Sequence, residues 1–244
     1  MSKIGQYILF LGALFKNPES FRTYFRLTVD ECVYIGLNSI TIVAIVSVFM
    51  GAVSTVQTAY NLISPLIPDS VIGLVVRDLT ILELAPTITA IVFAGKVGSS
   101  IAGNLGTMRI TEQIDALEVM GINSASYLVL PKVIATIFMY PFLVILAGVL
   151  AIGGGYLAAE FAGALAPADY LSGLQSSFNE FGVFFALIKS VVFGFLISSI
   201  SAYMGYYTKG GALEVGQSST KAVTVSCIAI LLSDFILAQL MLGS

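Results

Sequence analysis

Residues 33–60 contain no charged side chain at all. As an α-helix this run would be about 42 Å long, which is enough to cross the ~30 Å hydrocarbon core of a bilayer with some tilt. Only 10% of the 244 residues are charged, against roughly 25% in a soluble domain, so the chain has too few charges to cover a surface that faces water. We therefore predict an all-α integral membrane protein.

Five apolar runs of this kind can be traced along the chain. The predicted transmembrane spans are 33–60, 79–104, 133–159, 181–206 and 222–242. With their connections they form one five-span membrane domain over residues 28–244 and leave no room for a separate soluble domain. Residues 1–27 mix basic and aromatic residues with apolar ones at helical spacing, which is typical of a helix lying in the membrane interface. A cytoplasmic helix packed on its own protein is the alternative.

The basic residues indicate how the chain is oriented. If the N-terminus is cytoplasmic, the inner side carries eight of them: Lys3, Lys16, Arg22, Arg26, Arg109, Lys132, Lys209 and Lys221. The outer side keeps only Arg77. Positive residues are retained on the cytoplasmic side of membrane proteins, so we predict a cytoplasmic N-terminus and, after five spans, a C-terminus on the outer side.

Four ionisable residues fall inside the predicted spans: Glu83, Lys96, Lys189 and Asp234. Such a group costs at least about 2.5 kcal/mol at the centre of the bilayer, so each is a candidate functional residue. The alternative is that they pair with one another and only hold the helices together. We favour that structural role for Lys96 and Asp234, and a polar position in an internal cavity for Glu83 and Lys189.

A short polar segment between the second and third spans predicts a cytoplasmic helix over residues 111–121. Thr111 can cap its start and Gly121 fits its end. Ile114, Leu117 and Met120 form an apolar edge. The neighbouring polar residues are Glu112, Gln113, Asp115 and Glu118. The pattern suits a helix that enters a groove on a cytoplasmic partner, and a re-entrant turn packed on the chain's own spans explains it equally well.

Small residues and missing motifs narrow the function. Gly95, Gly98 and Ala102 lie in a stretch of the second span that can pack closely against another helix. The chain has no phosphate-binding G-x-x-x-x-G-K-[ST] loop, no H-E-x-x-H and no G-x-S-x-G. It has no histidine, two distant cysteines and no basic tract. We therefore expect no catalytic site, metal, cofactor or nucleic-acid partner, and any ATP-driven work must use a separate ATPase.

One segment is specific enough to suggest a family. Residues 112–121, E-Q-I-D-A-L-E-V-M-G, follow F-A-G-K-V-G-S-S-I-A-G-N-L-G-T-M-R at 93–109. Together they closely resemble the MlaE-type permeases of bacterial ABC lipid transporters, which are the permease partners of MCE proteins. Weaker similarities follow the same order along the chain: E-L-A-P at 83–86, L-V-L-P-K at 128–132, L-I-K-S-V-V-F-G at 187–194 and S-D-F-I-L at 233–237.

This resemblance implies an assembly around the chain. It implies a homodimer in the bacterial inner membrane, with a lipid cavity between the two copies and a periplasmic C-terminus. Cytoplasmic ABC ATPase subunits would hold ATP and Mg, a hexameric MCE-domain protein would sit on the periplasmic side, and a small STAS-type subunit could join in the cytoplasm. The transported molecule would be a phospholipid that moves between the inner and outer membranes.

The resemblance also implies roles for residues, with three departures. Glu112 to Gly121 would be the coupling helix that enters the ATPase, and Glu83 and Lys189 would lie near the lipid route. The family often has Arg where this chain has Leu82, and Gly where it has Ala85. Asn123-Ser124 replaces a common Asp-Pro, which predicts a looser exit from the coupling helix.

Two other functions fit the residues alone. An ion-coupled secondary transporter could use Glu83 and Asp234 as proton sites, because carboxylates within membranes can act in this way. A purely structural membrane subunit is a third reading. A secondary transporter would work alone, whereas an ABC permease is inert without its ATPase.

Overall fold

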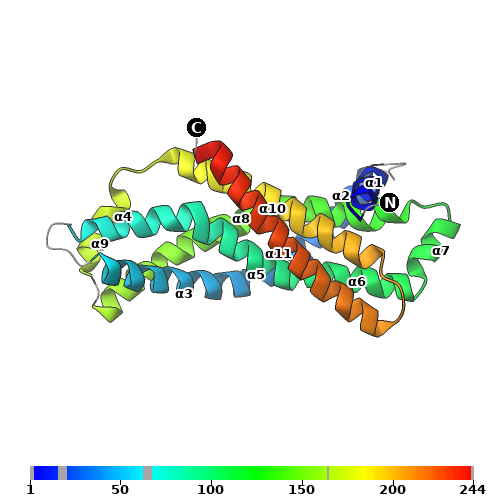
Figure 1. Ribbon diagram of the computed structural model, residues 1–244, viewed down its shortest axis with the longest axis horizontal. Coiled ribbons are helices and arrows are strands. Elements are labelled where there is room, and N and C mark those ends of the chain that lie inside the picture. The colour runs from blue at the N-terminus through cyan, green and yellow to red at the C-terminus, as the bar shows by residue number, and fades with distance from the viewer. Residues whose placement is uncertain (1–2, 16–20, 63–67, 164, 243–244) are drawn as a thin grey trace. The chain divides into compact units, whose positions relative to one another are not determined.

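The computed structural model describes residues 3–15, 21–62, 68–163 and 165–242, and these residues form helices and turns without any strand. Figure 1 shows the order of the helices. Their bounds are α1 (Lys3–Ala13), α2 (Phe21–Cys32), η1 (Val33–Leu37), α3 (Asn38–Asn61), α4 (Ser70–Leu79), η2 (Thr80–Ile88), α5 (Thr89–Phe93), η3 (Ala94–Gly98), α6 (Ser99–Ile110), α7 (Gln113–Val119), α8 (Ser124–Ala162), α9 (Pro167–Gln175), α10 (Glu180–Tyr206) and α11 (Ala212–Leu242), where η marks a π-helical segment.

The prediction of an all-α membrane protein is confirmed. In the described part of the chain, four helical stretches are long and apolar enough to cross a membrane: Phe21–Asn61, Ser124–Phe161, Glu180–Tyr206 and Ala212–Met241. They contain four of the five predicted spans. The remaining span, 79–104, falls on the consecutive segments η2 to α6, which are helical throughout but are not among these four. The crossing by this stretch stays a prediction.

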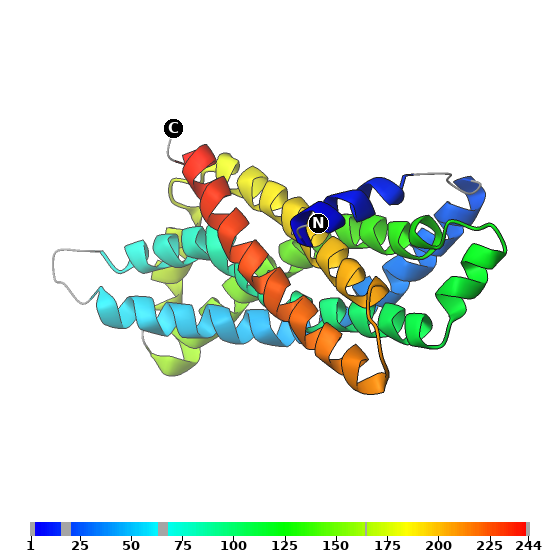
Figure 2. The same ribbon diagram turned by 45° about the vertical axis from the view of Figure 1, so that its right-hand side comes forward.

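The chain forms two compact units, which we describe separately. The first comprises residues 1–39, 90–140 and 191–244, and the second comprises residues 40–89 and 141–190. In the second unit, α4 lies beside α9 (Figures 1 and 2). A cluster of buried side chains fills the space around them: Ile72, Val76, Ala159, Leu165 and Tyr170. The Tyr170 hydroxyl donates to the Ile152 carbonyl at 3.1 Å, which ties α9 to α8.

Glycine allows α3 and α8 to cross closely in the second unit. A Cβ atom at Gly51 would lie 1.8 Å from the carbonyl oxygen of Ala151, and one at Gly154 would lie 2.1 Å from that of Val48. Neither position has space for any side chain, so both glycines are needed for the two backbones to touch. Close approach through small residues is the usual way in which helices associate in lipid.

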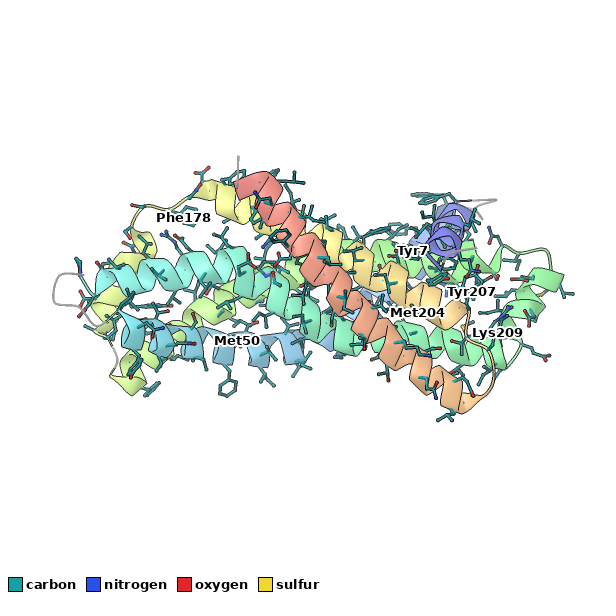
Figure 3. All side chains as sticks on the ribbon, in the orientation of Figure 1. Tyr7, Met50, Phe178, Met204, Tyr207 and Lys209 are labelled. Carbon is teal, nitrogen blue, oxygen red and sulfur yellow. The ribbon has the colours of Figure 1, made fainter. Side chains whose placement is uncertain are left out.

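In the first unit, α1 packs on the end of α10 through aromatic side chains. Phe10 is 2% exposed. The centre of its ring lies within 5.7 Å of the centres of three tyrosine rings at and just after the end of α10, those of Tyr203, Tyr206 and Tyr207. Tyr7 and Tyr207 are labelled in Figure 3. Large apolar side chains are exposed on α1, those of Ile8 and Leu9, and in the turn after it, that of Phe15. The helix therefore packs on its own protein with one face and keeps an apolar face of the kind that an interface helix needs.

The boundaries of several helices differ from the sequence-based expectation. Residues 16–20 of the predicted interfacial region lie outside the described residues, and α2 continues into the first span without a break at residue 27. α9 lies in the connection between the predicted spans 133–159 and 181–206. Most of the connection between the predicted spans 181–206 and 222–242 is helical, because α11 begins at Ala212. There the carboxylate of Glu214 accepts a hydrogen bond from the Gly211 N–H at 2.8 Å and stabilises the first turn.

Candidate functional site

Glu83 and Lys189 form an ion pair inside the second unit. The Nζ atom of Lys189, on α10, lies 2.7 Å from Oε1 of Glu83 on η2. The Lys189 side chain is completely buried, whereas that of Glu83 is 39% exposed. The ammonium group also lies 4.7 Å from the centre of the Phe185 ring, a favourable cation–π contact. The pairing that the sequence left as an alternative is therefore present, but its acidic member faces outward.

The backbone carbonyl of Leu82, four residues before Pro86, is a second acceptor for Lys189. Pro86 has no N–H group, so it cannot make the helical hydrogen bond to the carbonyl four residues earlier. That carbonyl belongs to Leu82, and it accepts a hydrogen bond from Nζ of Lys189 at 3.0 Å. The π-helical segment η2 carries this proline inside the helix. Leu82 and Glu83 thus provide a backbone carbonyl and a carboxylate to one buried ammonium group.

Thr87 fixes the other oxygen of the Glu83 carboxylate. Its hydroxyl donates to Oε2 of Glu83 at 3.2 Å, one turn further along the chain. Thr87 is 8% exposed, so the orientation of the carboxylate is set from the buried side. Of the two departures near this site, Leu82 gives its backbone carbonyl to Lys189, and Ala85 is buried. A Cβ atom at Gly148 would lie 3.7 Å from that of Ala85, so the extra methyl group fits against α8.

The predicted cytoplasmic helix is α7, which is shorter than expected. The prediction that Thr111 caps its start is wrong. Thr111 ends α6 with a hydroxyl bond to the Thr107 carbonyl at 2.8 Å. Glu112 precedes α7 in the left-handed region, with φ of 60°. Gly121 ends the helix as predicted, with φ of 80°. The N–H groups of Gly121 and Ile122 bond to the carbonyls of Glu118 and Leu117, the pattern of a Schellman motif.

The structure separates the apolar edge of α7 into two parts. Ile114 is completely buried in its own chain and Leu117 is half-buried, so these two seat the helix. Met120 is 66% exposed, and Val119, which the sequence analysis did not select, is 89% exposed. The polar residues Glu112, Gln113 and Asp115 are exposed as well. The apolar surface that α7 offers to a partner is therefore Val119 and Met120.

Hydrogen bonds of Asn123 and Ser124 hold the exit from α7, and the expected loosening relative to Asp-Pro stays a prediction. The Asn123 side chain accepts a hydrogen bond from the Ser126 N–H at 3.2 Å and donates to the Ala13 carbonyl at 3.0 Å. The hydroxyl of Ser124 donates to Glu118 at 2.9 Å, and that of Tyr206 donates to the same carboxylate oxygen at 3.0 Å. Asn123 is thus the N-cap of α8, a position that favours asparagine. It caps the helix without the Asp-Pro that is common in the family.

The predicted packing residues behave differently from one another. A Cβ atom at Gly98 would lie 2.8 Å from the hydroxyl of Ser201, and Ala102 lies directly under Gly205, so both pack against α10. A Cβ atom at Gly95 would meet no atom within 4 Å. Figures 1 and 2 show α6 crossing beside α11, which agrees with the many residues that the two helices bring together.

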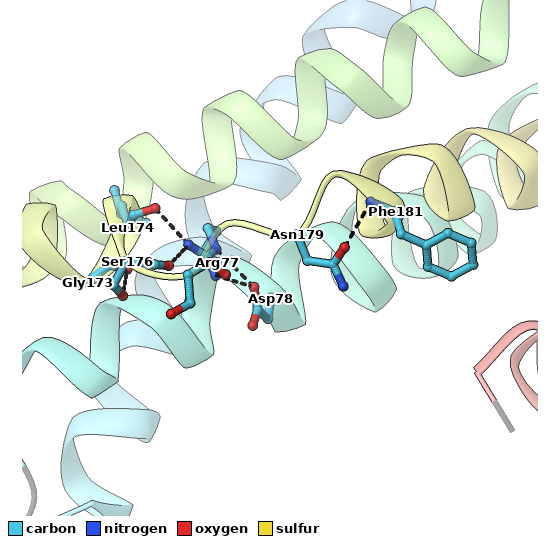
Figure 4. A network of polar contacts seen from close by, with 8 residues as sticks. Arg77, Asp78, Gly173, Leu174, Ser176, Asn179 and Phe181 are labelled. Atoms are coloured by element: carbon cyan, nitrogen blue, oxygen red, sulfur yellow. Dashed lines mark hydrogen bonds and ion pairs between the residues drawn. The ribbon is translucent and has the colours of Figure 1, made fainter. Parts of the chain in front are cut away.

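Arg77 is the site that sequence reasoning missed. It is 3% exposed, on α4, and it donates to the carbonyls of Leu174, Ser176 and Ser177 at 2.9, 2.5 and 3.3 Å. The carbonyl of Leu174 lies in the last turn of α9 and the other two follow that helix, and Figure 4 shows Arg77 beside Leu174 and Ser176. Its neighbour Asp78 accepts from it at 2.8 Å. A lone basic residue on the outer side, directly before an acidic one, was the available signal.

Within the first unit, Tyr7 links α1 to α10 by a hydrogen bond as well as by ring contacts. Its hydroxyl lies 2.7 Å from that of Ser199 on α10. Burial raises the pKa of the Tyr7 hydroxyl above its usual value, and the hydrogen bond to Ser199 offsets part of that rise. The group is therefore neutral over the physiological pH range, and its contact with α10 does not change with pH there.

Comparison with known proteins identifies the family. The MlaE permease family matches residues 28–240. A probable ABC transporter permease protein of Rickettsia bellii is 38% identical over 97% of this chain and 91% of its own length. Another from Synechocystis is 38% identical over 94% of this chain and 87% of its own. The chloroplastic protein TRIGALACTOSYLDIACYLGLYCEROL 1 of Arabidopsis thaliana is 32% identical over 89% of this chain and 62% of its own.

These matches cover the Glu83–Lys189 pair and α7 alike, since both lie within residues 28–240. The long apolar helices agree with a permease that crosses the membrane several times. The chain belongs to the MlaE permease family, and it is a multi-pass membrane protein that forms the permease subunit of an ABC transporter with a separate ATPase partner.

Proposed function

We propose that this permease moves phospholipids between the inner and outer membranes of a bacterium, driven by its partner ATPase. It works as a homodimer in the inner membrane, with the N-terminus in the cytoplasm and the C-terminus in the periplasm. An MCE-domain hexamer receives or delivers the lipid on the periplasmic side, and a small STAS-type subunit binds in the cytoplasm. This chain holds no cofactor, and ATP and Mg bind to the ATPase.

The Glu83–Lys189 pair is the observation that carries this proposal. A completely buried ammonium group is neutralised by a carboxylate that is 39% exposed, between helices that are otherwise apolar. Lys189 and Thr87 hold the carboxylate of Glu83 from the buried side, so the rest of its surface is open to a ligand. This exposed side of Glu83 offers a polar contact to a headgroup while apolar surface accommodates the acyl chains. One relative, named for a galactosylated diacylglycerol, also supports a lipid as the substrate.

α7 is the proposed point of contact with the ATPase. Ile114 anchors it, and ion pairing of Arg109 with Asp115 at 2.6 Å connects it to the end of α6. The exposed Val119 and Met120 then project as an apolar tip beside acidic residues. A movement in the ATPase groove would pass through this seated helix to α6 and α8, between which it lies (Figure 2).

Co-purification with the ATPase tests the coupling. The chain with Val119→Asp and Met120→Asp should lose co-elution and stimulated ATP hydrolysis, because two charges replace the apolar contact. Leu213→Asp is the matched control: Leu213 is 71% exposed and lies at the start of α11. Co-elution that survives the double substitution would contradict the role of α7.

Phospholipid transfer tests the substrate. Proteoliposomes that contain the permease and its ATPase should transfer a labelled phospholipid to acceptor vesicles carrying the MCE protein, and only when ATP is present. Solute movement under a proton gradient without the ATPase would favour the ion-coupled transporter instead. If the chain binds the ATPase but no lipid is transferred, the assignment as an ABC permease stands and phospholipid is refuted as its substrate.

A further inference from the structure

A cavity of about 90 Å³ that polar and apolar side chains line together lies within the first unit, apart from the residues of the Glu83–Lys189 pair. We call it the lysine pocket. It is formed by the end of α2, η1, the start of α3, η3, α6 and α8, and the polar residues that line it are Glu31, Tyr34, Asn38, Ser39, Lys96, Ser100, Asn104 and Lys132. Its volume is several times the ~30 Å³ that a water molecule occupies in the liquid.

The pocket contains two cations and one anion. Lys132 on α8 forms an ion pair with Oε1 of Glu31, and the two side chains are 13% and 22% exposed. Nζ of Lys96 donates to the backbone carbonyl of Asn38. Among the residues that the structure describes, no carboxylate is ion-paired with Lys96. The pocket therefore has one positive charge that its own side chains do not neutralise.

Two buried polar atoms in this pocket have no hydrogen-bond partner within the described chain. They are Oε2 of Glu31 and the hydroxyl oxygen of Ser39, a residue that is 1% exposed. Leaving such a group unpaired costs about 1–3 kcal/mol, so it requires an explanation. Oε2 of a carboxylate needs a donor, whereas the lysine and the serine hydroxyl can donate. A ligand with both a donor and an anionic acceptor would satisfy all three groups.

The position of the pocket suits a lipid rather than a soluble anion. Glu31 and Lys132 directly precede the first and third predicted spans, and Lys96 lies towards the same end of the second. With the orientation proposed above, this is the cytoplasmic edge of the bilayer, where headgroups lie. The adjoining helical turn exposes apolar side chains beside the lining residue Tyr34, with Val33 at 52% and Leu37 at 56%. Acyl chains can lie along that surface.

We propose that the lysine pocket binds the phosphoethanolamine headgroup of an inner-leaflet phospholipid. Lys96 donates to the phosphate, together with the hydroxyl of Ser39. The primary ammonium donates to Oε2 of Glu31, while Lys132 keeps the other oxygen of that carboxylate in place. This inference rests on the proposed phospholipid substrate and adds a headgroup class and a loading site on the cytoplasmic side.

Native mass spectrometry of the full chain in complex with its ATPase tests the site directly. The probes are dioctanoyl phosphatidylethanolamine, phosphatidylcholine and phosphatidylglycerol, and inorganic phosphate. Lys96→Met should weaken binding of phosphatidylethanolamine about tenfold, the effect of losing one hydrogen bond to a charged group. Glu31→Gln should remove most of the preference for phosphatidylethanolamine over phosphatidylcholine, whose trimethylated nitrogen has no N–H. Lys221→Met, on the exposed side of α11, should change neither.

Each outcome decides the matter. Equal binding of phosphatidylethanolamine by the wild type and the Lys96 variant overturns the proposal, and so does a wild type without headgroup preference. Binding of inorganic phosphate that prevents lipid binding would identify a phosphate site instead. Should Glu31→Gln fail to fold, Lys96→Met still decides, because among the described residues the Lys96 ammonium donates to a backbone carbonyl and forms no ion pair. ATP-dependent lipid transfer that persists without binding at this pocket would refute the pocket and leave the transport function standing.

Discussion

Arg77 and Lys189 are two buried cations of the same unit, and they are held in opposite ways. Arg77 donates to three backbone carbonyls in and just after the last turn of α9, and its acidic partner is the adjacent residue, 46% exposed. Lys189 has one carbonyl, and its acidic partner comes from another helix. The guanidinium group therefore joins two pieces of backbone, which suits its planar set of five donors.

The two sites also differ in which polar groups a ligand could still contact. The donors of Arg77 are used on the carbonyls of residues 174, 176 and 177 and on Asp78, so little remains for a ligand. Its guanidinium group also lies over the ring of Phe178, whose centre is 5.6 Å away. At the other site the Glu83 carboxylate is reached from outside, while Lys189 holds it from inside. We infer that Arg77 serves the fold and that Glu83 serves transport. The following experiments separate these two roles.

Removing Glu83 alone should have the largest effect on stability. Glu83→Leu leaves the ammonium group of Lys189 buried without its counter-charge, and the free energy of unfolding should fall by about 3 kcal/mol, the lower end of the range because Glu83 is partly exposed. Because the chain has no tryptophan, thermal unfolding in detergent is best followed by circular dichroism at 222 nm. The double variant Glu83→Leu with Lys189→Met should recover most of the loss. A double variant as unstable as the single one would show that charge pairing is not the cause.

Substitution of Arg77 should have the second largest effect on stability and no effect on transport. Arg77→Met leaves three carbonyls without their donor and should lower the free energy of unfolding by about 2 kcal/mol. Asp78→Asn should cost less than about 1 kcal/mol, because its ion pair is half exposed. ATP-dependent phospholipid transfer per folded molecule should be unchanged in both. Reduced transfer by a well-folded Arg77 variant would contradict the assignment of this residue to the fold.

Much of the fold could be predicted from the sequence, because apolar runs and turn residues act locally. The run 33–60 and the stop at Gly121 required no knowledge of other segments. α9 was missed because its helix is short and is stabilised by α4: a Cβ atom at Gly173 would lie 2.0 Å from the Ser70 carbonyl oxygen. Thr111 was assigned to the wrong helix because a cap motif does not reveal which neighbouring helix its side chain will join.

The candidate sites were predictable only in part. The cost of ionised groups in lipid singled out Glu83 and Lys189, but their pairing depends on two helices about a hundred residues apart in the chain. The sequence did not show which apolar residues of α7 are buried and which are exposed for a similar reason. The burial of Ile114 depends on parts of the chain outside α7. The lysine pocket was not predicted, because Glu31 and Lys132 each read as ordinary charges at the end of a span.

A conservative change at Glu83 should affect transport more than stability. Glu83→Gln also removes the counter-charge but keeps an oxygen that can accept from Lys189, so the free energy of unfolding should fall by less than the ~3 kcal/mol expected for Glu83→Leu. Phospholipid transfer should fall about tenfold, because a neutral amide holds a polar headgroup less strongly than a carboxylate. Initial transfer rates measured beside Asp78→Asn provide the comparison. Equal rates in the two variants would remove the functional distinction between the carboxylates.

Thr87 should give the smallest effect and the finest test. Its hydroxyl holds Oε2 of Glu83 at 3.2 Å, and Thr87→Val keeps the shape of the side chain while removing that bond, at a cost of about 0.5–1 kcal/mol. If Thr87 acts only by orienting the carboxylate, transfer should fall about threefold, roughly the rate equivalent of that free energy. The same substitution should then have almost no further effect in the Glu83→Gln background, where the oriented charge is already gone. Independent, multiplying losses in this double-mutant cycle would mean that Thr87 contacts the lipid route by itself.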